Sequence, residues 1–373
     1  VWTNYVGFIS RMGMPNTMDV IMGTILILLV LEASRRISGW PLVILSMLFI
    51  AYGLFGKNMP GIFAHRGYMW PQLVNHIFIN TEGIYGTSVS VASSYIFLFI
   101  LFGAVMNKSG MGQFFNDIAL ALAGHTKGGP AKVAVIASGF LGSINGSAVA
   151  NVVTTGAFTI PLMKKTGYSK EFAGSVEASA SVGGQLLPPI MGAAAFIMAE
   201  MLGVKYSVIV ISAAIPALLY YFGILVQVQL RASKNDLKGI PREDLPKVRD
   251  VMAARGHLII PILFLLYMLL FSGRTVIFSA FLTILVTIGV SMLKMQTRMS
   301  LKDIIDAFEE GAKSTVSVAV ACAVVGIIIG VVSVTGFGLN MANAIIQVGN
   351  ANLLATLFLT MITCMILGMG LPS

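Results

Sequence analysis

The chain has little charge and few of the side chains that most enzyme centres need. Charged residues make up 10% of its 373 residues, and it holds two cysteines and four histidines. Both cysteines fall inside apolar runs without metal-ligand spacing and the histidines are scattered, so we expect no metal site, no cofactor and no enzymatic activity. A soluble globular domain is excluded as well, because 57% of the residues are hydrophobic.

The excess of positive charge does not point to nucleic acid. The chain carries 24 Lys and Arg against 15 Asp and Glu, a formal net charge of +9. The basic residues fall in short segments between apolar runs, for example Arg35 and Arg36 after the first run. The positive-inside rule of membrane proteins accounts for this distribution. We therefore predict an all-α polytopic membrane protein that lies in a lipid bilayer and has no nucleic-acid partner.

One stretch, Gly139–Pro161, organises the rest of the chain. An apolar run stops there at small polar residues and an equally apolar run then resumes. Each arm is shorter than the roughly 20 apolar residues of a transmembrane helix, so we predict a re-entrant helical hairpin over residues 131–161. Unpaired carbonyls and amides at its tip would form a site for a cation or a carboxylate. The alternative is a single ordinary helix with a few small packing residues.

A second break, Gly183–Pro189, lies inside the apolar segment 171–202. Paired prolines cannot sit inside a continuous helix, and Pro188 and Pro189 would fit the first turn of a new half-helix. We predict a broken helix, of the kind that transporters use around a binding site. A Gly-Pro turn between two separate helices is the alternative.

The chain ends carry one further expectation. It begins at Val1 without a Met or a signal peptide and stops at Ser373 directly after a polar break, so we expect a fragment of a longer polypeptide. The apolar runs and the charges between them divide it into five parts. These are residues 1–56 with two apolar runs, a connector 57–86, a first repeat 87–230, a cytoplasmic linker 231–257, and a truncated second repeat 258–373.

The two repeats are related by a shift of 226 positions. This shift superimposes glycines that begin an arm and residues that break a hairpin: Gly110 on Gly336, Gly112 on Gly338, Leu141 on Leu367, Gly142 on Gly368 and Ser147 on Ser373. The loop charges give the two copies opposite orientations, so we predict inverted repeats with paired re-entrant tips and a site where the repeats meet. In the second repeat we expect a surface helix over 301–313 and a span over 314–334.

Two motifs resemble a known family. The stretch LGSINGSAVANVVTTGAFTIPLMKKTGY, up to Tyr168, and GGQLLPPIMGAAAFIMAE, from Gly183 to Glu200, are similar to the fused membrane subunits of tripartite ATP-independent periplasmic (TRAP) transporters. The branch served by TAXI-type binding proteins is the most similar. The resemblance covers nearly the whole chain, with residues 1–56 similar to the end of the small membrane subunit.

The resemblance implies an elevator-type secondary transporter of the prokaryotic inner membrane. It would take an organic acid from a periplasmic TAXI-type binding protein and import it with sodium, or alternatively with protons. Relatives more often have Ser at positions 145 and 148, which leaves the coupling ion open. The alternatives are an ion-coupled carboxylate transporter without a binding protein and a non-transporting scaffold. A channel would need a continuous polar path, whereas two re-entrant hairpins that enter from opposite faces do not provide one.

The resemblance also implies site residues. The first cation site would use the hairpin tip and the helix break: Ser143, Asn145, Ser147, Gly183, Gly184 and Pro188. A second would use Gly368, Gly370 and Ser373. The substrate carboxylate would be held by Asn145, Gly146, Asn151 and Gln185.

One acidic residue needs separate mention. Glu177 lies on the half-helix that leads to the second break, and carboxylates embedded in a membrane are usually functional. It would act as a proton carrier or pair with a basic residue. The alternative is a hydrated side chain near the cytoplasmic end of the helix.

Overall fold

The structure, a computed structural model, describes residue 7 and residues 13–349 and 352–368. All regular secondary structure in this part of the chain is helical, with no strand. Among the described residues, six helices are long and apolar enough to cross a membrane: Thr17–Ser38, Trp40–Asn58, Thr87–Lys108, Tyr206–Lys234, Arg242–Leu270 and Leu301–Thr335. The prediction of an all-α polytopic membrane protein is confirmed.

The chain divides into two compact units, which we describe one at a time. One comprises residues 1–93 and 316–372, and the other comprises residues 94–315 with residue 373. Helix α16 (Leu301–Thr335) contributes to both units, and so does the π-helix η4 (Ala92–Ile96), which is described with the second unit.

The first unit contains the helices at both ends of the described chain. These are α2 (Thr17–Ser38), α3 (Trp40–Phe55), α4 (Trp70–Val74), the π-helix η3 (Asn75–Ile79), α5 (Thr87–Val91), the second part of α16, α17 (Phe337–Val348) and α18 (Leu353–Gly368). Two short 3-10 helices, Gly56–Asn58 and Gly61–Phe63, lie in the connector. The core is apolar and includes Ile27, Leu73, Ile77, Ile327 and Val331. The predicted connector 57–86 is therefore partly buried.

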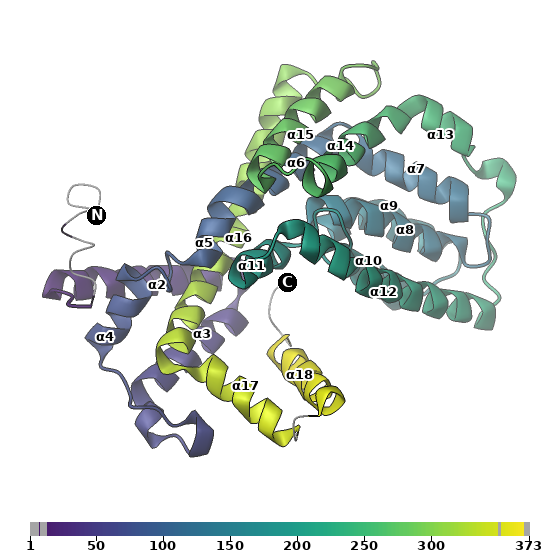
Figure 1. Ribbon diagram of the computed structural model, residues 1–373. Helices are drawn as coiled ribbons and strands as arrows, with labels where there is room; N and C mark the ends of the chain where they lie inside the picture. Colours follow the sequence, from purple (N-terminus) through teal and green to yellow (C-terminus); the bar gives the residue numbers. More distant parts are fainter. Residues whose placement is uncertain (1–6, 8–12, 350–351, 369–373) are drawn as a thin grey trace. The chain divides into compact units, whose positions relative to one another are not determined.

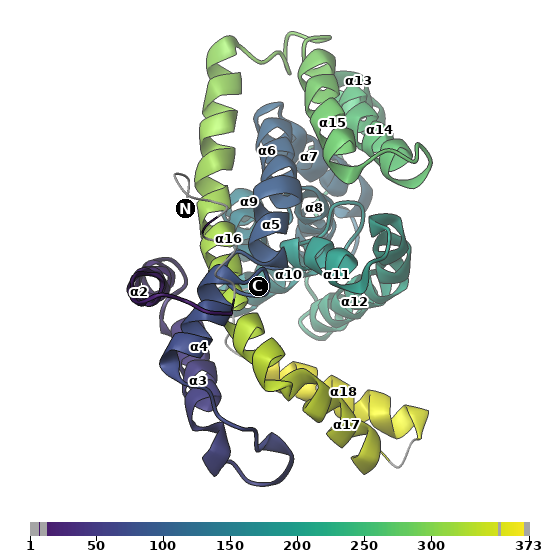
Figure 2. The same ribbon diagram turned by 60° about the vertical axis from the view of Figure 1, so that its left-hand side comes forward.

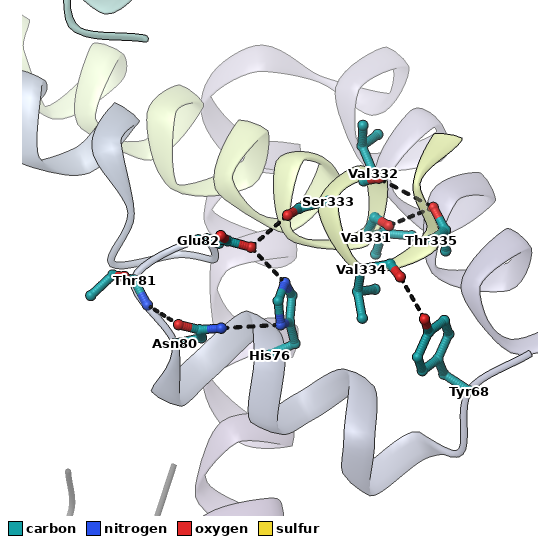
Figure 3. A network of polar contacts seen from close by, with 10 residues as sticks. All are labelled: Tyr68, His76, Asn80, Thr81, Glu82, Val331, Val332, Ser333, Val334 and Thr335. Atoms are coloured by element: carbon teal, nitrogen blue, oxygen red, sulfur yellow. Dashed lines mark hydrogen bonds and ion pairs between the residues drawn. The ribbon is translucent and has the colours of Figure 1, made fainter. Parts of the chain in front are cut away.

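A polar network joins the connector to the end of α16 (Figure 3). Glu82 accepts a hydrogen bond from Ser333 Oγ at 2.5 Å, and its Oε2 lies 3.2 Å from His76 Nε2. Tyr68 Oη donates to the carbonyl of Val334 at 2.5 Å. The polar side chains of the connector thus find hydrogen-bond and ion-pair partners beside the apolar core.

This network predicts a pH dependence of stability. Burial lowers the pKa of His76, and Glu82 opposes the shift. The unfolded chain, with a His pKa of about 6.5, therefore binds the proton more tightly than the folded chain, so stability is lost as the pH falls below that value. We expect the thermal unfolding midpoint in detergent to fall less between about pH 7.5 and about pH 5.5 in His76→Gln than in the wild type. Equal falls would contradict this account.

The second unit contains the remaining helices (Figures 1 and 2). They are the π-helix η4 (Ala92–Ile96), α6 (Phe97–Lys108), α7 (Met111–Ala123), α8 (Gly129–Asn145), α9 (Ala148–Lys165), α10 (Lys170–Gly184), α11 (Ala193–Leu202), α12 (Tyr206–Lys234), α13 (Val248–Arg255), α14 (Ile259–Leu270), α15 (Val276–Ser291) and the first part of α16. Short 3-10 helices occupy Arg242–Asp244 and Gly256–Leu258. Helices α8, α9, α10 and α12 share a core of small and aromatic residues that includes Ala134, Met163, Ala180 and Tyr221.

Helix α12 has the surface of a lipid-facing helix. Large apolar side chains remain exposed along it: Ile211, Ile215, Leu218, Leu219 and Phe222. In water such a row would be costly, whereas in a bilayer it faces hydrocarbon. This distribution agrees with a span between residues 206 and 234.

Two expectations about the loops differ from the structure. The separate surface helix 301–313 and span 314–334 are wrong, because one 35-residue helix, α16, covers both. No Pro interrupts the segment, and Lys313 pairs with Glu309 one turn earlier at 2.5 Å, which supports a continuous helix. Part of the linker 231–257 is also ordered as α13, whose Arg255 donates to Asp117 of α7 at 3.1 Å.

The element boundaries recur at the spacing of the predicted repeat. Helices α7 and α17 begin at Met111 and Phe337, and each follows a glycine with positive φ, +89° at Gly110 and +68° at Gly336. A second helix packs against each of them, α8 in one case and α18 in the other, and Figure 2 shows α17 and α18 side by side. The opposite orientation of the two copies stays a prediction.

Candidate functional site

The predicted hairpin is built from α8 and α9, which lie side by side (Figure 1). Helix α8 has 17 residues and ends at Asn145, and the next residue, Gly146, has a φ of +63° that lets its N–H reach the carbonyl of Gly142 at 3.0 Å. Helix α9 has 18 residues and begins after Ser147, whose side chain accepts a hydrogen bond from the N–H of Ala150 at 3.3 Å. A left-handed glycine and a serine cap thus reverse the chain in two residues.

The second break separates α10 from α11. Helix α10 ends at Gly184, and α11 begins only at Ala193. The prediction that Pro188 and Pro189 occupy the first turn of the second half-helix is wrong, because both lie in the turns that precede it. The loop is closed instead by the N–H of Gly192, which donates to the carbonyl of Gln185 at 2.8 Å.

The hairpin tip and the helix break contact each other directly. The N–H of Ile190 donates to the carbonyl of Ser143 at 3.2 Å, and Gln185 Nε2 donates to the carbonyl of Gly146 at 3.4 Å. Gly142 and Gly184 meet backbone to backbone, since a Cβ on Gly184 would lie 2.5 Å from the Cα of Gly142. The structure therefore brings together the two irregular segments of the first repeat, as a site between them requires.

The polar side chains of the tip mostly serve the tip itself. Ser143 is buried and donates to the carbonyl of Phe140 at 2.8 Å, while Asn145 Oδ1 accepts from the N–H of Ser147 at 3.2 Å. Asn151 is fully buried, and its Nδ2 donates to the carbonyl of Ser138 at 2.8 Å. Asn151 therefore joins α9 to α8.

The other predicted residues are spread more widely. Gly183 lies against Tyr220 and Tyr221, because a Cβ there would be 2.5 Å from the ring of Tyr220 and 2.9 Å from that of Tyr221. Gly368 is the last residue of α18. Gly370 and Ser373 lie outside the described residues.

Glu177 lies among buried hydroxyl groups, all of which the sequence analysis missed. Its carboxyl group is within hydrogen-bonding distance of Ser138, Thr155, Thr159 and Ser181. Glu177 is 0% exposed, which does not fit the alternative of a hydrated side chain. A signal was available, since Thr155 and Thr159 lie four residues apart on one face of α9, and Ser181 lies four residues after Glu177.

A hairpin docked on a broken helix, in an all-α membrane protein, is the arrangement of a membrane transport protein. The chain belongs to the family of the DctM component of tripartite ATP-independent periplasmic transporters, whose family model matches residues 25–373. This confirms the TRAP resemblance, and the family consists of transporter permeases rather than enzymes.

Individual relatives match shorter parts of the chain. A putative TRAP transporter large permease protein of Haemophilus influenzae is 32% identical over 116 residues, which cover 30% of this chain and 27% of the relative. The 2,3-diketo-L-gulonate TRAP transporter large permease protein of Escherichia coli is 33% identical over 107 residues, 28% of this chain and 25% of the relative. The C4-dicarboxylate TRAP transporter large permease protein of Pseudomonas aeruginosa is 30% identical over 147 residues, 39% of this chain and 34% of the relative. The matched regions thus span about a quarter to a third of these relatives.

Proposed function

We propose that this protein is the membrane permease component of a secondary transporter that imports an organic acid across the prokaryotic inner membrane. A periplasmic binding protein of the TAXI type delivers the acid, and a sodium gradient, or alternatively a proton gradient, drives its movement. The observation that carries the proposal is the contact between the hairpin tip and the helix break, through Ser143 with Ile190 and Gln185 with Gly146. Irregular backbone at membrane depth is tolerated where it serves a binding site.

The chemistry of the tip suits both a cation and a carboxylate. Carbonyl oxygens at the end of α8 and the hydroxyl of Ser147 are oxygen ligands, which hard cations prefer. The N–H groups at the start of α9 and the helix dipole attract a carboxylate. Two of the relatives described above are named for the carboxylates C4-dicarboxylate and 2,3-diketo-L-gulonate, which supports an organic acid as substrate.

The proposed sites use the residues that the family resemblance implies. The cation is held at the tip and the break by Ser143, Asn145, Ser147, Gly183, Gly184 and Pro188. The substrate carboxylate is held by Asn145, Gly146, Asn151 and Gln185. An elevator-like motion carries both across the membrane, and a second cation site at Gly368, Gly370 and Ser373 serves the second repeat.

The test is transport by two matched serine variants. Ser147 and Ser169 both cap a helix, and each accepts from the N–H three residues later at 3.3 Å. Loss of either cap is expected to cost about 0.5–2 kcal/mol of stability. We expect Ser147→Ala alone to abolish sodium-driven uptake of labelled organic acids, measured in liposomes that contain the full-length protein with its binding protein.

The outcomes separate the possible functions. Equal uptake by Ser147→Ala and Ser169→Ala would mean that Ser147 acts as a helix cap only, and it would contradict a cation site at the tip. Uptake without the binding protein would favour a carboxylate transporter that works alone. Concentrative uptake that survives dissipation of both gradients would contradict secondary transport, and absence of any uptake by the wild type would favour a scaffold.

A further inference from the structure

A buried carboxyl group lies in the middle of the α8, α9 and α10 package. Glu177, Ser138, Thr155, Thr159 and Ser181 are all 0% exposed. Ser138 Oγ is 2.7 Å and Ser181 Oγ 3.3 Å from Glu177 Oε1, and Thr159 Oγ1 is 2.5 Å from Oε2. Thr155 Oγ1 also contacts Oε1. Three helices thus supply one closed shell of hydroxyl groups.

The surroundings of this shell are mainly apolar, with one titratable neighbour, Tyr221, whose hydroxyl donates to the carbonyl of Ala180 at 2.7 Å. Ala134 and Val135 of α8 and Ala173, Val176 and Ala180 of α10 belong to the same buried core. Within the described part of the chain, no Lys, Arg or His forms an ion pair with Glu177. An ionised carboxylate is costly to bury without a cation, whereas a neutral carboxylic acid with hydrogen-bond partners is far less so. The predicted alternative of a basic partner finds no support here.

The number of hydroxyl protons leaves room for one more proton. Thr159 Oγ1 is 3.0 Å from the carbonyl of Thr155, and Thr155 Oγ1 is 2.8 Å from the carbonyl of Asn151. Each hydroxyl has one proton, so two threonines that donate to their own helix leave two contacts with the carboxyl group without one, Thr159 with Oε2 and Thr155 with Oε1. One further proton can fill one of these two contacts. A protonated Glu177 does so by donating to Thr159 Oγ1.

The same shell also suits the ionised form. If the hydroxyl proton of Thr159 turns from the carbonyl of Thr155 to Oε2, the carboxylate accepts it, and no heavy atom has to move. A hydroxyl group is both donor and acceptor, whereas a Lys or Arg partner would favour the ionised carboxylate alone. The shell is therefore built to accept a proton and to give it up.

Two contacts of the carboxyl group have the lengths of strong hydrogen bonds. Thr159 Oγ1 lies 2.5 Å from Oε2, and Ser138 Oγ lies 2.7 Å from Oε1.

The shell is connected to the hairpin tip. Asn151 Nδ2 donates to the carbonyl of Ser138 at 2.8 Å, and the same amide lies next to Gly142, where α8 meets Gly184. Asn151 alone therefore lies between Ser138 of the shell and Gly142, which belongs to the contact between the hairpin tip and the helix break. A cycle of protonation at Glu177 has a short route to the proposed transport site.

We propose that Glu177, in its shell of Ser138, Thr155, Thr159 and Ser181, is the proton-carrying group of this permease. The proposal rests on the proposed transport function and adds a proton to it. The O–H bond of Glu177 forms with a proton from water on one side of the membrane and breaks when that proton passes to water on the other side.

Infrared spectroscopy tests the site independently of transport. In the purified full-length protein we expect the carbonyl stretch of a buried protonated carboxylic acid. The band should be absent from Glu177→Gln and unchanged in Glu171→Gln, a matched control whose glutamate is exposed in the first turn of the same helix. A wild-type protein with no such band at any pH, or one whose band survives in Glu177→Gln, would overturn the proposal.

Transport tests the role of the same proton. We expect uptake driven by a proton gradient alone to be lost in Glu177→Gln and kept in Glu171→Gln. Wild-type uptake that needs sodium only would overturn the proton-carrying role and leave the proposed function intact. If the wild type transports nothing, the proposed function fails, and the proton-carrying role fails with it even if the infrared band is present.

A second variant covers the case in which Glu177→Gln does not fold. Thr159→Val removes the hydroxyl 2.5 Å from Oε2 and keeps the shape of the side chain. The carboxyl group then loses a hydrogen-bond partner, so we expect its infrared band to shift. An unshifted band in a folded Thr159→Val protein would overturn the assignment of the shell.

Discussion

Gly184→Ala is expected to lose both stability and organic-acid uptake. A Cβ at this position would lie 2.5 Å from the Cα and 2.8 Å from the carbonyl carbon of Gly142. Backbone atoms cannot rotate away as a flexible side chain can, so α8 and α10 would have to separate. Overpacking of this kind costs about 1–3 kcal/mol. The thermal unfolding midpoint in detergent and uptake in liposomes measure the two effects.

Gly174→Ala is the matched control, because it lies on the same helix and nothing lies within 4 Å of its Cβ position. Alanine is favoured over glycine inside a helix, so this change is expected to leave stability unchanged or raise it by about 0.4–1 kcal/mol. Uptake by Gly174→Ala should equal that of the wild type. Equal stability of the two variants would mean that α8 and α10 do not depend on close glycine contact.

Close contact between two glycines is a common way for helices to pack in a membrane. Helices in a bilayer gain little from burying apolar side chains, since the lipid is equally apolar, and they associate through small residues that let backbones approach. Gly142 and Gly184 use this type of packing where the hairpin meets the broken helix. The contact also keeps side chains out of the space between the tip and the break.

The features that could be predicted from the sequence are those that depend on residues that end or cap a helix. Gly146 and Ser147 interrupt an apolar run, and the positive φ of Gly146 and the cap of Ser147 are properties of these residue types. The same holds for the break after Gly184. Such signals act over one or two turns of helix, so they are readable without knowing the packing.

Features that depend on packing were not predictable in this way. The start of α11 at Ala193 is set by contacts of the loop with distant residues, such as Ile190 with Ser143, and not by the prolines. The shell of Glu177 needs the register of α8 against α10 to bring Ser138 to the carboxyl group. The continuity of α16 follows from the absence of any strong helix breaker near Lys313, where the sequence analysis places the boundary between a surface helix and a span.

Gly146→Ala is expected to have the largest effect at the hairpin tip. Gly146 has a φ of +63°, a conformation that costs an L-residue about 1–2 kcal/mol. In addition, its Cβ would lie 2.5 Å from the carbonyl oxygen of Met191, on the opposite side of the contact between tip and break. The substitution therefore strains the backbone and also pushes the tip away from the break, so we expect loss of uptake together with a lower unfolding midpoint.

Gly203→Ala separates these two causes. Gly203 ends α11 with a φ of +64°, but nothing lies within 4 Å of its Cβ position, so alanine there brings only the backbone strain. Uptake by Gly203→Ala should stay near the wild-type level, with a loss of stability of about 1–2 kcal/mol. If both variants lost uptake equally, strain at any helix end would suffice to stop transport. A selective loss in Gly146→Ala would instead assign the function to the contact between Gly146 and Met191, because the two positions differ in that contact and not in their backbone conformation.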